Sequence, residues 1–368
     1  MIPSIAPRIE INLAKIAHNA KILSKLFGSK GIQIMGITKG VCGSPEVARE
    51  FVNNGIHLLG DSNITNLKKM HEAGIKAEFV LVRTPALSEI ELVFSYADIS
   101  LNTELTVIKS LSDVATSNNS VHKIILMIEM GDLREGIMPA NIVEFIQEVL
   151  HLPGVKIVGI GANFACFGGI KPDEENMKLL SELAIAMEKR FSLSLPYISG
   201  GNSANYNWFL TTKNTGQVNN LRLGESILLG RETLNRIAIP GLFTDAFSFI
   251  SEVIESKIKP SVPYGEITQN SLGQTPHFKE RGNIRRGILK VGFQDVLVSG
   301  LTPKLDMEIL GSSSDHTVLD AKKVNLQVGD EVAFSLNYGA VLSVMSSPNV
   351  LKKYIHTLSA NEQSQIQF

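Results

Sequence analysis

The sequence predicts an α/β protein, a parallel (β/α)8 TIM barrel followed by a smaller β-rich domain. Three observations predict this fold. Short apolar runs alternate with amphipathic helical segments through the first two thirds of the chain. The runs are nearly all apolar, which is typical of parallel strands covered on both faces. Eight such units fit within about 200 residues, and this spacing favours a closed barrel over an open sheet.

Each barrel unit joins an apolar run to a helical segment. We expect strands at residues 33–38, 57–60, 78–83, 98–101, 123–129, 155–163, 196–199 and 220–223. We expect helices at residues 45–53, 65–71, 87–96, 104–115, 140–150, 173–190 and 204–211. Several helices follow a capping residue, as at Ser44 before Pro45, which is a favoured helix start.

The pattern changes after about residue 240, where helical periodicity fades. Short strands are expected at residues 247–258, 287–293, 307–310, 316–319, 331–336 and 341–345. We therefore assign residues 1–236 to the barrel and residues 237–368 to a β-rich domain. A strand expected at residues 8–12 could belong to the β-rich domain, so the assignment of residues 1–12 stays open.

Composition and charge argue against several classes of protein. The formal net charge is −1 and the basic residues are scattered, so no nucleic-acid footprint is expected. The longest uncharged apolar stretch, residues 157–170, is shorter than the ~20 residues of a membrane span. The first residues lack a basic region followed by an apolar run, so we expect a cytoplasmic protein. Two cysteines cannot form a disulfide framework.

A lysine ends the first barrel strand, where barrels carry their working residues. Lys39 is the only charge between Lys30 and Glu46, in the segment IMGITKG. It could extend outward or pair with a carboxylate. Alternatively, apolar surroundings could lower its pKa and let the amine form a Schiff base with an aldehyde cofactor.

The fifth strand runs into the segment MIEMGDLREG, which gathers several charges. Glu129, Asp132 and Glu135 could include a glycosidase acid and base, although adjacent loop carboxylates are more often solvated. Arg134 is the stronger candidate, because its planar fork suits a carboxylate or a phenolate oxygen.

The last three barrel strands predict a phosphate site. Asn163 ends the sixth strand, and it could point into the barrel mouth or close a turn. The seventh ends in YISGGNSANY, where glycine amides precede Asn202 or Ser203 as a helix cap. Arg222 lies on the eighth strand, before Gly224, and it could be a structural ion-pair partner or address a ring nitrogen. Together with Lys39, these residues match the three groups by which pyridoxal 5′-phosphate is held, namely its aldehyde, its phosphate and its ring nitrogen.

The chain resembles the alanine-racemase-like, fold-type III pyridoxal-phosphate enzymes, and within them the ornithine racemase group. The matching stretches keep the family's order and span Lys39 to Tyr338: GITKGVCG, MGDLREG, YISGGNSAN, NNLRLGESILLGRET, KVGFQDV, GSSSDHTVLD and SLNYGA. The resemblance implies a barrel with a β-rich domain, bound pyridoxal phosphate and racemisation of a small amino acid.

The resemblance also implies roles for individual residues. Lys39 would bind the cofactor covalently and act as one proton-transfer base, and Arg222 would meet the pyridine nitrogen. The phosphate would be bound by Ser203, Gly224, the backbone of Glu225 and the Tyr338 hydroxyl. Arg134 would contact the ring oxygen or the substrate carboxylate, and Asn163 would lie beside the ring.

Racemisation needs proton access to both faces of the α-carbon, so a second base is expected opposite Lys39. The resemblance implies a tyrosine from the β-rich domain of a partner subunit, which is Tyr264 in PYGEI. It also places Asp315 near the incoming substrate. A shared site of this kind requires a homodimer.

Departures from alanine racemases bear on the substrate. This chain has Met127 where they carry a lysine, Asn163 where they carry a histidine, and Gly43 and Phe293 where they carry tyrosines. These changes favour another amino acid, with ornithine or a related one as the expectation and alanine as an alternative.

Other functions stay open at this point. Cys42 and Cys166 lie just beyond strand ends, where two thiols could serve a cofactor-free racemase. A pyridoxal-dependent retro-aldol enzyme would use a metal, and no ligand cluster with suitable spacing is seen, so no metal is expected. A non-catalytic pyridoxal-phosphate-binding protein is the alternative from a different class.

Overall fold

The computed structural model describes residues 5–270, 273–359 and 362. The chain divides into two compact units. The barrel unit contains Lys15–Thr244, and the β unit contains the described residues before Lys15 and those from Asp245 to Glu362. The expected boundary at residue 236 therefore lies inside the barrel unit. Backbone bonds from Glu232 to Ile237 and from Ile239 to Gly230 keep this segment folded back on itself.

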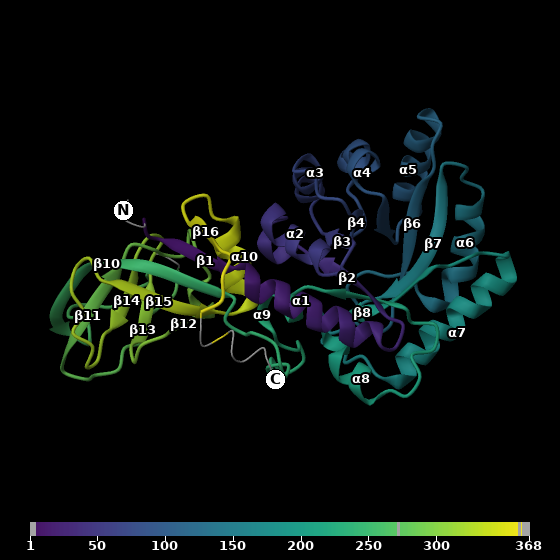
Figure 1. Ribbon diagram of the computed structural model, residues 1–368. Helices are drawn as coiled ribbons and strands as arrows, with labels where there is room; N and C mark the ends of the chain where they lie inside the picture. The colour runs from purple at the N-terminus through teal and green to yellow at the C-terminus, as the bar shows by residue number, and fades with distance from the viewer. Residues whose placement is uncertain (1–4, 271–272, 360–361, 363–368) are drawn as a thin grey trace. The chain divides into compact units, whose positions relative to one another are not determined.

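The predicted parallel barrel is confirmed. Eight strands close a ring in chain order, with the first paired to the last. They are β2 (Gln33–Ile37), β3 (Leu58–Asp61), β4 (Glu78–Leu81), β5 (Ile99–Asn102), β6 (His122–Ile128), β7 (Val155–Ala162), β8 (Tyr197–Asn202) and β9 (Asn220–Leu223). Figure 1 shows helices of this unit packed around the strands.

One helix precedes the first barrel strand and the others follow barrel strands, and they bury apolar faces. They are α1 (Leu13–Gly28), α2 (Pro45–Asn53), α3 (Ile64–Glu72), α4 (Ile90–Tyr96), α5 (Leu105–Ser117), α6 (Ile142–Leu150), α7 (Glu174–Phe191), α8 (Tyr206–Thr211) and α9 (Glu225–Leu229). Ser44 caps α2 as expected, because its hydroxyl accepts a bond from the Val47 N–H. Among the described residues, no helix is long and apolar enough to cross a membrane.

The inside of the barrel is a packed apolar core. Alternate residues of each strand point inward, and the buried cluster includes Met35, Ile37, Leu101, Ile125 and Met127. Because the interior is filled, the barrel has no channel. Inward-facing polar side chains can therefore gather only at the ends of the strands.

The β unit is built around one sheet in the order β12-β15-β10-β11-β14-β13, with β1 attached to β10 and β16 attached to β1. Its strands are β1 (Arg8–Asn12), β10 (Phe247–Pro260), β11 (Asn283–Leu289), β12 (Leu301–Pro303), β13 (Glu308–Ser312), β14 (Thr317–Asp320), β15 (Glu331–Leu336) and β16 (Leu351–Ile355). The strand at residues 8–12 pairs antiparallel with β10 and parallel with β16, both within this unit.

Two expectations for the β unit were wrong in detail. The expected strand at residues 341–345 is part of helix α10 (Tyr338–Ser346). Asn337 caps this helix through a bond from the Ala340 N–H to its Oδ1 (2.9 Å). The strand expected at residues 287–293 begins earlier, as β11, because the segment pairs with the long strand β10 as far as Pro260.

Candidate active site

Lys39 stands at the carboxyl end of β2, in the inward alternation set by Met35 and Ile37. It opens a single 3-10 turn, Lys39–Val41, and is half-buried. Among the described residues Lys39 forms no ion pair, so the structure does not support a role for it as a salt-bridge partner. Burial lowers the pKa of its amine, and the nearby Arg134 and Arg222 guanidinium groups lower it further. More of the amine is therefore neutral and nucleophilic near pH 7.

Arg222 lies on β9, the strand beside β2, and only 6% of it is exposed. Its Nη1 donates to Ser199 Oγ (2.7 Å), and its Nη2 donates to Ala162 O (2.8 Å) and Asn163 Oδ1 (3.3 Å). It forms no ion pair with a carboxylate among the described residues, so the structural ion-pair reading is not supported. Burial lowers the pKa of Arg222 to about 10, which leaves it cationic at neutral pH.

The ends of β8 and β9 form a cradle. Asn202 caps the 3-10 turn Ser203–Asn205 by accepting a bond from the Ala204 N–H (2.8 Å). The buried Ser203 hydroxyl lies 3.1 Å from Ser226 Oγ and accepts from the Ser226 N–H (3.3 Å). A Cβ at Gly224 would lie 3.2 Å from the Cβ of Ile37, so a larger residue would crowd the end of β2.

The loop after β6 brings Arg134 to the same end of the barrel. Its Nε and Nη2 pair side-on with the carboxylate of Glu135. Its Nη1 donates to Cys166 Sγ (2.7 Å), which comes from the loop after β7. Both side chains act on Lys39, because Cys166 raises the pKa of the lysine and Arg134 lowers it.

Glu129 and Asp132 are not solvated, and they do not form an acid–base pair. Asp132 is 2% exposed, and its carboxylate accepts the N–H groups of Cys166 (3.2 Å), Phe167 (3.0 Å) and Gly168 (3.1 Å). Glu129 is 8% exposed and accepts two further N–H groups, at residues 131 and 133. Burial alone would raise the pKa of Asp132, but the N–H donors outweigh it and lower that pKa. Glu129 therefore braces the loop after β6, and Asp132 ties that loop to the loop after β7.

The sequence reasoning missed Asp61, a fully buried carboxylate at the end of β3. It accepts bonds from Thr38 Oγ1 (2.8 Å), the Asn63 N–H (2.9 Å) and Asn66 Nδ2 (3.0 Å). Burial raises the pKa of Asp61, and its negative charge partly offsets the lowering of the Lys39 pKa. Asp61 ends an apolar strand as Lys39 does, so the same positional filter could have found it.

The remaining candidates belong to the β unit. Tyr264 lies between β10 and β11 and is 93% exposed. Asp315 lies between β13 and β14 and is exposed, with its Oδ1 2.9 Å from His316 Nδ1, and this hydrogen bond lowers the pKa of Asp315. Tyr338 is the half-buried first residue of α10. Their roles at the barrel site stay predictions.

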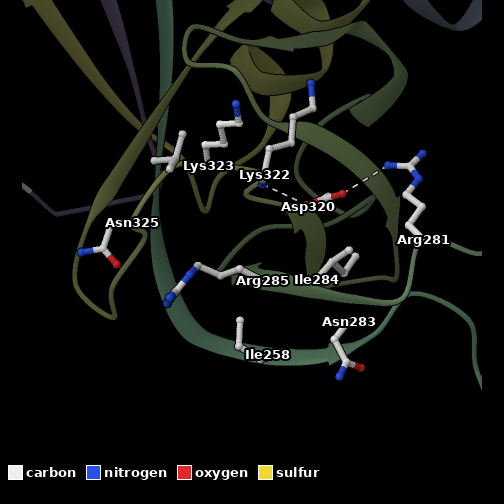
Figure 2. Close-up of a pocket in the computed structure, with 10 residues that line it drawn as sticks. Ile258, Arg281, Asn283, Ile284, Arg285, Asp320, Lys322, Lys323 and Asn325 are labelled. Atoms are coloured by element: carbon white, nitrogen blue, oxygen red, sulfur yellow. Dashed lines mark hydrogen bonds and ion pairs between the residues drawn. The ribbon is translucent and has the colours of Figure 1, made fainter.

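A separate hollow of about 510 Å³ lies in the β unit, between β11 and the segment after β14 (Figure 2). Its cations are partly neutralised, because Arg281 pairs with Glu308 and Asp320 and Lys322 pairs with Asp306. It contains none of the predicted site residues. Among the described residues, no group of three or more His, Cys, Asp or Glu could hold a metal ion.

Comparison with known proteins agrees with this geometry. Residues 11–232 match the family described as alanine racemase, N-terminal domain. The chain is 37% identical to an ornithine racemase of Acetoanaerobium sticklandii over 353 residues, 95% of this chain and 99% of that protein. It is also 37% identical to a lysine racemase of Thermotoga maritima, over 95% and 99% of the two chains.

A solved structure shares the whole fold. An alanine racemase of Clostridium difficile 630 superposes with a TM-score of 0.72 over 96% of both chains, at 17% identity. At that identity the likeness shows the fold alone. The match over residues 11–232 covers more than half of the chain, and the two racemases match nearly all of it. The chain therefore belongs to the alanine racemase N-terminal domain family.

Proposed function

We propose that the protein is a pyridoxal-phosphate-dependent amino-acid racemase, an isomerase that interconverts the L- and D-forms of ornithine or a related basic amino acid. The observation that carries this proposal is the placement of Lys39, just after β2, and Arg222, on the neighbouring strand β9, at the barrel end that also holds the Ser203 cradle. The similarity to ornithine and lysine racemases over nearly the whole chain supports both the reaction and the substrate class.

The residues of the barrel mouth fit pyridoxal phosphate. Lys39 offers an amine whose pKa is lowered, and Arg222 offers a buried cation with no carboxylate partner among the described residues. The phosphate would be held by Ser203 and by the backbone at Gly224 and Glu225, with Tyr338 as a further proposed ligand. When bound, the cofactor supplies an electron-withdrawing ring system that acidifies the α-proton of the attached amino acid.

The protein's own residues would then position the reacting groups and move protons. Lys39 Nζ takes and returns the α-proton on one face, and we assign the opposite face to the hydroxyl of Tyr264. Arg222 stays protonated near pH 7, so it would donate a hydrogen bond to the ring nitrogen of the bound cofactor without transferring a proton to it. Asn163 lies against Arg222 and supports the ring position, while Arg134 and Asp315 address the substrate.

We extend the proposal to assembly and location. A homodimer would bring Tyr264 from the partner subunit to Lys39, as the resemblance implies. A cytoplasmic enzyme without nucleic-acid or membrane partners is consistent with the near-zero net charge. The Arg134 contact with Cys166 gives one of the two cysteines a local role that needs no cofactor-free chemistry.

The test is solvent deuterium exchange at the α-carbon, with cofactor-loaded protein and a panel of L- and D-amino acids. We expect exchange and inversion with ornithine or lysine, at rates well above those for alanine. Borohydride should trap the cofactor on Lys39, and a Lys39→Ala variant should lose the trapped product. Exchange without inversion, cleavage of β-hydroxy amino acids, or no turnover of any member of the panel would each overturn the proposal.

A further inference from the structure

We propose that Glu135 determines the preference for basic amino acids by binding the terminal ammonium group of the substrate. In the absence of substrate, the Glu135 carboxylate forms an ion pair with the guanidinium of Arg134. A substrate α-carboxylate would take over Arg134, and the displaced Glu135 would pair with the ammonium at the end of the side chain. This inference rests on the proposed function and assigns its specificity to a residue.

The first support is the geometry of the ion pair. Glu135 engages Arg134 through Nε and Nη2, which is the side-on arrangement that a substrate carboxylate would adopt. The Arg134 side chain is 34% exposed and the Glu135 side chain is 27% exposed, so both ends of the pair are accessible. Ion pairs with this exposure are weak, and exchange of one carboxylate for another is therefore easy.

The second support is that the neighbouring carboxylates are committed elsewhere. Asp61, Glu129 and Asp132 are buried and accept hydrogen bonds from the residues beside them. Glu225 pairs with Arg236 (3.4 Å). Unlike these, Glu135 is held by a cation that the proposed mechanism assigns to the substrate.

The third support is electrostatic. The Arg134 and Arg222 guanidinium groups both act on Lys39, and Asp61 offsets them only in part, so a second ammonium group at the barrel mouth is disfavoured. A substrate with a cationic side chain needs a carboxylate there, and the exchange provides one. A neutral side chain would leave Glu135 displaced without a partner, which disfavours the neutral substrate.

The experiment compares ornithine with norvaline, which has the same carbon chain without the terminal amine. Binding to the cofactor-loaded protein is measured by calorimetry, and kcat/KM is measured by deuterium exchange, for the wild type and for Glu135→Gln. We expect the ornithine-to-norvaline ratio to fall at least about tenfold in Glu135→Gln, about 1.4 kcal/mol of discrimination. Glu135→Asp keeps the charge and should retain part of the ratio.

The matched control is Glu104→Gln. Glu104 is an exposed carboxylate that follows β5 at the same end of the barrel, and its side chain makes no capping bond to α5. This variant should keep the wild-type ratio. A ratio within twofold of wild type in Glu135→Gln, or an equal fall in Glu104→Gln, would overturn the assignment of Glu135. If wild type binds both amino acids but racemises neither, the proposed function fails while the binding ratio still tests Glu135.

Discussion

Replacement of Arg222 by methionine should remove activity at little cost in stability. The guanidinium is buried and has no carboxylate partner among the described residues, and burial lowers the pKa of Arg222 from 12.5 to about 10. Each pKa unit corresponds to about 1.4 kcal/mol, so burial of the charged guanidinium lowers the free energy of unfolding by about 3 kcal/mol. The folded pKa lies below the unfolded one and above 7, so the whole cost is present at neutral pH.

Arg222→Met removes that cost but also removes hydrogen bonds. Ser199 Oγ and Ala162 O would lose their donor, and each buried acceptor left without a partner costs about 1–3 kcal/mol. The two effects nearly cancel, so the free energy of unfolding should change by less than about 2 kcal/mol. Racemisation should fall at least about 100-fold, because a donor to the cofactor ring is lost.

Two measurements check this prediction. Urea denaturation of the cofactor-free protein gives the free energy of unfolding, and deuterium exchange of the loaded protein gives the activity. Arg190→Met, which removes an exposed arginine of α7, is the control and should change neither by much. A loss of more than about 4 kcal/mol in Arg222→Met would refute the reasoning, since Arg222 would then be a structural anchor rather than a charge retained for function.

Three further predictions concern other residues of the site. Asp132→Ala should destabilise the protein by about 3 kcal/mol, because three backbone N–H groups lose their acceptor, and it should speed proteolysis between residues 130 and 170. Folding lowers the pKa of Asp132, so its carboxylate stabilises the fold fully above pH 3.8, the pKa in the unfolded chain. This stabilisation is lost as the pH falls through the lower pKa of the folded state, which acid denaturation of the wild type and the variant would show. Asp61→Asn should lower the pKa of the Lys39 amine further, and the acid limb of the pH profile of kcat, which reports the substrate complex, should move to lower pH, whereas an unmoved limb would separate Asp61 from Lys39. Tyr264→Phe should slow proton exchange in one direction at least about tenfold more than in the other, and equal mild effects would remove Tyr264 as the second base.

The barrel was predictable because its signal is local and repeated. Each parallel strand is buried on both faces and is therefore an apolar run in the sequence. Each helix places apolar residues at the helical period of about 3.6 residues. The error at residues 341–345 has a physical cause. Val341, Val344 and Met345 resemble a strand in composition, but with Ala340 they form the buried stripe of a helix that Asn337 caps. A short apolar run cannot by itself distinguish these two structures.

The site was predictable where a residue's position alone implies its chemistry. Lys39 and Arg222 are charges next to apolar strands, so they are conspicuous in the sequence. The partners of Arg222 were not predictable, because Ser199 and the Ala162 carbonyl become its acceptors only through the barrel register. The same holds for Asp132, whose three N–H donors come from a loop more than 30 residues away.

The cations of the barrel mouth have a physical meaning when they are considered together. Burial lowers the pKa of both Lys39 and Arg222, and the charge of Arg134 lowers both further. Glu135 pairs with Arg134, and Asp61 offsets part of the lowering of the Lys39 pKa, whereas the buried carboxylates Glu129 and Asp132 accept backbone N–H groups instead. Among the described residues, Lys39 and Arg222 have no carboxylate ion-pair partner, so their positive charge is available to an anionic ligand, as the phosphate and carboxylate of a cofactor–amino acid pair would supply. On this reasoning, binding of pyridoxal phosphate should stabilise the wild-type fold more than it stabilises Arg222→Met.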